Sequence, residues 1–157
     1  MLYGQFVGSW DVSGDYRDDD GHCFRYVGEW HFAWVLDGSA VQDVLTLQML
    51  DEAGRPEPTR GAGTTVRVYD PEVDAWHITW MGPASREFCT LLGRADGNDI
   101  VQDVQWSYDG DRRPRRWTFS EITADTFVWR GVVSDDGGRS FRQEQEMRCR
   151  RPSTARE

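Results

Sequence analysis

The segment from Gly28 to Met49 constrains the fold more than any other part of the chain, because two runs of alternating apolar residues flank a tight turn. The turn, at 36–39, contains Asp37-Gly38, and glycine accepts the positive φ that a hairpin turn requires. Alternation with a period of two places the apolar side chains on one face of each strand. The segment therefore predicts a long antiparallel β-hairpin.

An acidic residue interrupts the apolar face of this hairpin. Trp30 and Trp34 lie on that face in the first run, and Asp43 shares it with Leu45 in the second. Burying an isolated carboxylate is unfavourable, so Asp43 must be paired, protonated or directed at a polar ligand. The hairpin face is therefore the first candidate for a functional site.

The rest of the chain continues as short strands separated by polar turns, with no helical period and no internal repeat. Two irregular segments stand out. The segment 51–63 holds two prolines and three glycines and is expected to be a loop, either a mobile flap or a surface excursion. Residues 17–21 (RDDDG) are expected to form a solvated turn, because they lack the alternate spacing of a calcium loop.

Short connections between about ten strands imply antiparallel neighbours in chain order. The expected fold is all-β: a single antiparallel up-and-down β-barrel of about 8–10 strands, spanning 1–150 and followed by a disordered tail at 151–157. Closure into a barrel removes exposed strand edges. An open two-sheet sandwich is the alternative.

Composition excludes several classes of function. The chain has 157 residues, 27 of them acidic and 18 basic, and the net charge of -9 argues against a nucleic-acid partner. No lysine occurs, so Schiff-base chemistry and covalently held pyridoxal phosphate are excluded. Three distant cysteines indicate neither a disulfide framework nor a zinc site. Without a signal-like N-terminus or a long apolar run, we expect no membrane partner and a cytoplasmic location.

Gly8-Ser9-Trp10 resembles the G-x-W signature of the calycin superfamily, which includes the lipocalins and fatty-acid-binding proteins. The stretches 28–44, 63–80, 116–131 and 135–148 are similar to a family of uncharacterised bacterial lipocalin-like domains. The resemblance implies a lipocalin-like barrel with an internal cavity. It also implies that Trp10 closes one end and packs against a basic residue of a late strand, Arg130 or Arg148. Such barrels mostly bind small apolar or aromatic molecules, and only some are enzymes.

Continuing the alternation along the strands gives the residues expected to face the lumen. The candidate ligand-binding residues are Trp30, Trp34, Trp80, Gln102, Trp106, Trp129 and Gln143. Polar groups among tryptophans would orient a mostly apolar guest. In the alternative interpretation, Asp43 and Glu121 lie near strand ends and pair with arginines such as Arg67 or Arg130.

The leading functional hypothesis is binding of a small apolar or aromatic molecule. A cofactor-independent cyclase, isomerase or dehydratase is the first alternative, with Asp43 or Glu121 as acid or base. His31 is a further candidate base beside Glu29, although a regular strand places it outside unless a bulge near Gly28 turns it inward. The second alternative is an oligomeric scaffold, for example a homodimer. Three histidines without H-x-H spacing favour neither a metal site nor haem, so no cofactor is expected.

Overall fold

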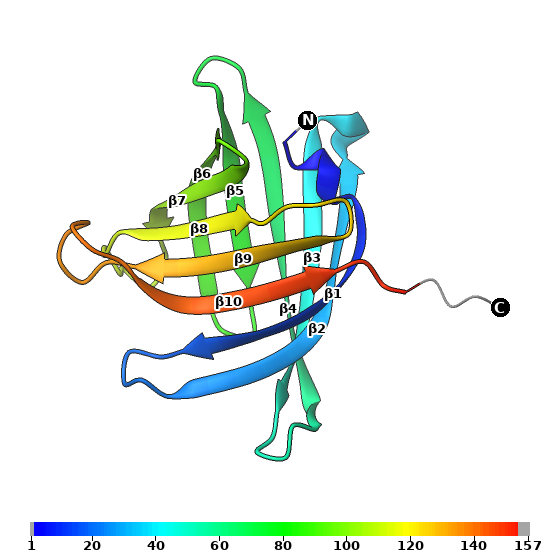
Figure 1. The fold of residues 1–157 in the computed structure, drawn as a ribbon. Helices are drawn as coiled ribbons and strands as arrows, with labels where there is room; N and C mark the ends of the chain where they lie inside the picture. Colours follow the sequence, from blue (N-terminus) through cyan, green and yellow to red (C-terminus); the bar gives the residue numbers. More distant parts are fainter. Residues whose placement is uncertain (1, 154–157) are drawn as a thin grey trace.

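The structure is a computed structural model that describes residues 2–153, and its ten antiparallel strands form one closed barrel (Figure 1). The strands are β1 (Gly8–Arg17), β2 (Cys23–Val35), β3 (Ala40–Leu50), β4 (Pro56–Asp70), β5 (Ala75–Gly82), β6 (Glu87–Asp96), β7 (Asp99–Ser107), β8 (Arg115–Ser120), β9 (Thr126–Val133) and β10 (Arg142–Arg150). Each strand pairs with its neighbour in sequence, and β1 pairs with β10 to complete the ring. The predicted up-and-down barrel is confirmed.

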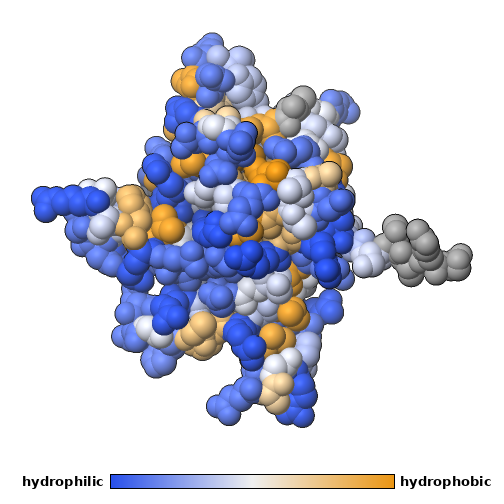
Figure 2. Space-filling model, viewed as in Figure 1, coloured by the Kyte–Doolittle hydropathy of each residue, from blue (hydrophilic) through white to orange (hydrophobic). Residues whose placement is uncertain are grey.

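Alternation along the strands explains which residues form the core. In β5, Trp76 and Ile78 point inward and are buried, whereas His77 between them points outward and is exposed. Most of the outer surface on the face shown in Figure 2 is hydrophilic, with apolar residues in small separate areas. No helix among residues 2–153 is both long and apolar enough to cross a membrane.

The predicted loop at 51–63 is wrong. Only 51–55 form a turn, and β4 begins at Pro56. The Asp51 side chain organises the turn by accepting hydrogen bonds from the backbone N–H groups of Ala53 and Arg55, each at 2.9 Å. The first part of β4, residues 56–63, pairs with β3 and not with β5. Proline has no backbone N–H to donate, but no second strand lies on this side of β4 to need one. This hairpin projects at the bottom of the view in Figure 1.

One end of the barrel, called the closed end below, is covered by the short helix η1 (Gly4–Phe6). Trp10 of the G-x-W motif is buried there, and its indole N–H donates to the carbonyl of Phe6 at 2.7 Å. The guanidinium over the Trp10 ring belongs to Arg151, whose Cζ lies 3.8 Å from the ring centroid. Arg151 also donates to the carbonyl of Val7 at 3.0 Å.

The prediction that Arg130 or Arg148 would pack on Trp10 is therefore wrong. Both belong to strands but point to the outer face, where they contact Glu146. Arg151 reaches Trp10 because it follows β10 directly and its backbone N–H still bonds to the carbonyl of Asp125. It was predicted to lie in the disordered tail. The rest of that predicted tail from residue 154 lies outside the described residues.

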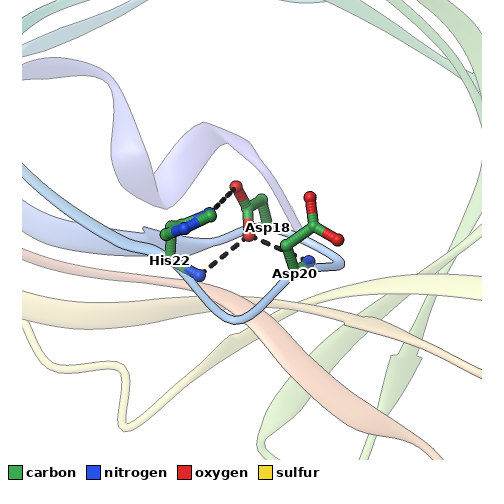
Figure 3. Close-up of side chains that lie close together, drawn as sticks. All are labelled: Asp18, Asp20 and His22. Atoms are coloured by element: carbon green, nitrogen blue, oxygen red, sulfur yellow. Dashed lines mark hydrogen bonds and ion pairs between the residues drawn. The ribbon is translucent and has the colours of Figure 1, made fainter.

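The acidic turn between β1 and β2 is held by one side chain (Figure 3). Asp18 accepts hydrogen bonds from the backbone N–H groups of Asp20 and His22, and its second oxygen lies 3.1 Å from Nδ1 of His22. Asp20 and His22 are exposed. The predicted turn is confirmed, and the Asp18 carboxylate stabilises the hairpin from within it.

Candidate functional site

A cavity of about 670 Å³ occupies the half of the barrel opposite η1. We call this half the open end, because it carries the turns that follow β1, β3, β5, β7 and β9. Aromatic and apolar side chains supply most of the cavity wall: Tyr16, Phe24, Tyr26, Trp30, Leu45, Leu47, Met49, Trp80, Trp117, Trp129 and Met147. A volume of this size fits a small organic molecule.

Three tryptophans form a continuous part of the wall. The ring centroids of Trp80 and Trp117 lie 6.4 Å apart, and those of Trp117 and Trp129 lie 5.4 Å apart. Two glycines allow the Trp80 ring to lie against the sheet. A Cβ on Gly63 would come within 2.1 Å of this ring, and a Cβ on Gly82 within 3.0 Å. The glycines therefore keep Trp80 at the wall, and the space inside remains open.

Two indole N–H groups in this wall lack partners. Nε1 of Trp30 and Nε1 of Trp80 are buried and make no hydrogen bond within the described part of the chain. Trp30 as a whole is 3% exposed. A buried donor without an acceptor is unfavourable by about 1–3 kcal/mol. A guest that carries a hydrogen-bond acceptor would remove this unfavourable contribution.

The floor of the cavity is a buried polar network. Arg67, 2% exposed, forms an ion pair with Asp43 and lies 3.5 Å from Oε1 of Gln102 through its Nε. Gln102 also accepts from the Tyr3 hydroxyl at 3.0 Å, and the Arg67 guanidinium lies 4.9 Å from the Tyr3 ring centroid. The backbone N–H of Thr65 donates to Asp43. Arg67 and Thr65 line the cavity, so this network separates the cavity from the closed-end core.

Two groups of polar side chains lie in the cavity wall between the polar floor and the open end. Nε2 of Gln145 donates to the Tyr26 hydroxyl at 2.6 Å, and burial raises the pKa of Tyr26. Glu87 lines the wall near the open end, where burial raises its pKa. The indole N–H of Trp80 is close enough to Glu87 to lower that pKa in part, but the two do not form a hydrogen bond.

Ion pairs connect three of the turns at the open end. Arg113, from the turn after β7, lies 3.1 Å from Asp19 and 2.8 Å from Asp135. Arg142 contacts the same two aspartates, each at 2.6 Å. One side of the cavity mouth is therefore cross-linked, whereas the projecting β3–β4 hairpin makes no ion pair with this group among residues 2–153.

Four of the seven predicted ligand-binding residues point to the interior of the barrel. Trp30, Trp80 and Trp129 line the cavity. Gln102 points inward but belongs to the network beneath it. Trp34 lies at the closed end, with its ring against Gly4 of η1, because β2 extends past the core at this point.

The predicted inward positions of Trp106 and Gln143 are wrong, and both errors come from β-bulges. In β7 the register shifts so that Trp106 pairs with Thr90 while Val104 pairs with Leu91, leaving an extra residue between them. In β10 the shift falls between Gln143 and Gln145. Each bulge reverses the alternation, so Trp106 and Gln143 point outward and are exposed.

The predicted acid and base candidates are separated in the structure. Asp43 is 1% exposed and its carboxylate is engaged by Arg67. Glu121 was expected on the inward face, but it follows β8 at a positive φ of 51° and pairs on the outside with Arg130 at 3.1 Å. His31 is exposed, with Nδ1 2.9 Å from the Ser9 hydroxyl, because β2 pairs with both neighbours without a register shift.

Sequence reasoning placed Gln145 on the inward face, as the structure does, but missed Glu87 and Tyr26 as polar groups of the cavity. The sequence analysis assigned Glu87 no role, yet Cys89 and Leu91 point inward, and extending their alternation by one step would have found it. Cys89 itself is buried, and burial raises the pKa of its thiol to about 12, so it is protonated at neutral pH.

Comparison with solved structures shows that other proteins share this closed-barrel fold. The S-type phycobiliprotein lyase CPES from Guillardia theta aligns with a TM-score of 0.63 at 13% identity, covering 98% of this chain and 92% of the lyase. Rv2717c from M. tuberculosis aligns with a TM-score of 0.64 at 14% identity, covering 96% of this chain and 95% of that protein. No family model and no curated protein sequence matches this chain.

Proposed function

We propose that this protein binds a small, largely aromatic molecule inside the barrel. One observation carries the proposal: a cavity of about 670 Å³ has tryptophan walls, and two of its buried indole N–H groups have no acceptor within residues 2–153. A filled core would satisfy or omit such donors. The apolar walls would supply most of the affinity, and Trp30 and Trp80 would orient the guest through its acceptors.

The geometry gives less support to the two alternatives. Acid or base catalysis by Asp43 would first require release of its ion pair with Arg67, and Glu121 points away from the cavity. A scaffold that acts through its outer surface would leave the cavity and its unpaired donors without a use.

Tryptophan fluorescence tests the proposal directly. Aromatic alcohols such as anthracenylmethanol absorb where tryptophan emits, so binding in the lumen should quench tryptophan emission and produce energy transfer to the anthracene. Trp80→Phe keeps an aromatic ring but removes the donor, and we expect affinity to fall about two- to tenfold.

Trp106→Phe is the matched control, because Trp106 is 56% exposed on the outer face. It should leave the affinity unchanged. If no member of a broad panel of aromatic molecules changes the emission, or if both substitutions have the same effect, binding in the lumen is refuted.

A further inference from the structure

One charge in the cavity wall is not balanced by the protein. Four charged residues line the cavity: Glu57, Arg60, Arg67 and Glu87. Glu57 and Arg60 are exposed on the projecting hairpin and have opposite charges, and Arg67 is neutralised by Asp43. Glu87 remains.

Glu87 has no ionic partner within the described residues. The arginine with the largest effect on its pKa is Arg115, and Nη2 of that arginine lies 2.7 Å from a carboxylate oxygen of Asp111. The other charged groups that influence Glu87 are the acids Glu144 and Asp109. The surroundings of Glu87 are therefore deficient in positive charge.

The position of Glu87 in the barrel directs its carboxylate to the guest. Glu87 begins β6 and pairs with Gly82 of β5. Because Gly82 has no side chain, that residue does not cover the neighbouring carboxylate. The indole N–H of Trp80 lies beside it. A partly buried carboxylate forms a charge-assisted hydrogen bond with an ammonium group, which is stronger than a hydrogen bond between neutral groups. The net charge of -9 further favours positively charged molecules.

Building on the proposed lumenal binding, we propose that Glu87 binds a protonated nitrogen of the guest, so that the barrel selects basic aromatic amines over neutral aromatic molecules of the same shape. The tryptophan wall holds the ring system, and Glu87 holds the ammonium group near the open end. Glu87 is then a determinant of specificity.

A pair of probes of equal size tests this inference. Anthracenylmethylamine is protonated at neutral pH, whereas anthracenylmethanol is neutral, and both report binding by energy transfer from tryptophan. In the unmodified protein the amine should bind at least about tenfold more tightly than the alcohol, as a charge-assisted hydrogen bond in a partly buried site allows. In Glu87→Gln this preference should disappear, while the affinity for the alcohol stays the same.

Glu57→Gln is the matched control, because it removes an exposed carboxylate at the same cavity mouth. The preference for the amine should persist in this variant. Glu87→Gln breaks no ion pair, and its thermal unfolding should confirm that it folds.

The outcomes separate the inference from the proposed function. If both probes bind equally in the unmodified protein, or if Glu87→Gln retains the preference, the role of Glu87 is refuted while lumenal binding stands. Loss of the preference in Glu57→Gln as well would show a general surface-charge effect and would also overturn the inference. If neither probe binds, the proposed function fails first.

Discussion

Replacing Gly63 by alanine should close part of the cavity without unfolding the barrel. The new Cβ would lie 2.1 Å from Cη2 of Trp80, 2.6 Å from Cζ2 and 2.8 Å from Cζ3. Ordinary van der Waals contact begins at 3.4 Å, so the edge of the indole must move by at least 1.3 Å, the difference between the two distances. The sheet blocks movement outward, whereas the cavity offers free space on the inner side.

The loss of stability depends on which group moves to remove the clash. Overpacking in a filled core is unfavourable by about 1–3 kcal/mol. Here the ring can move into the cavity, so we expect the free energy of unfolding to fall by less than about 1 kcal/mol. The affinity for an aromatic guest should fall about tenfold or more, because the Trp80 ring would then occupy part of its site.

Two measurements check this prediction: chemical denaturation for stability and energy transfer to anthracenylmethanol for affinity. Gly61→Ala is the control, since it adds a methyl group to the same face of the same strand with its nearest contact at 3.4 Å. Affinity that is unchanged in Gly63→Ala, or lowered equally in Gly61→Ala, would refute the role of Gly63 in keeping the cavity open.

Three further predictions concern stability. Gly28→Ala should destabilise the barrel by about 3 kcal/mol or more, because its Cβ would lie 1.9 Å from the backbone oxygen of Thr46. Unlike an indole ring, a paired backbone cannot rotate away from the clash. A denaturation midpoint equal to that of Gly61→Ala would contradict this prediction. Arg67→Met should lower the free energy of unfolding by about 3–5 kcal/mol, because it leaves Asp43 buried and unpaired. Adding Asp43→Leu to this variant should restore much of the lost stability. An Arg67→Met variant as stable as the unmodified protein would contradict the prediction. Hydrogen bonds from Arg113 lower the pKa of Asp111 from 3.8 to about 2, so this stabilisation is complete above about pH 5 and is lost as the pH falls toward 2. Over this pH range the melting temperature should change less with pH in Arg113→Gln than in the unmodified protein. An equal dependence on pH would exclude the Arg113–Asp111 pair as a cause.

Local periodicity was enough to predict the barrel, because residues two positions apart share a face wherever a strand is regular. It correctly placed Trp30, Trp80 and Trp129 inside. It failed at Trp106 and Gln143, because each is separated by a bulge from the rest of its strand and a single extra residue puts the two sides of the bulge out of phase. Nothing in the local pattern marks those two bulges.

Contacts between distant strands were harder to predict from the sequence. Arg67 was considered only as one of several possible partners of Asp43, since choosing among arginines requires knowing the register between β3 and β4. Arg151 was missed because a residue beyond the last strand has no periodicity to place it. Its packing on Trp10 depends on where β10 ends relative to η1, which only the assembled barrel defines.

The projecting β3–β4 hairpin has a consequence for how a guest reaches the lumen. Residues 56–63 of its β4 arm pair with β3 only, so their backbone amides should exchange with deuterated solvent well before those of the barrel proper. Glu57, Thr59 and Arg60 of this hairpin also form the rim of the cavity. Fraying at that single point would widen the passage for a bulky guest while the ring of ten strands stays intact.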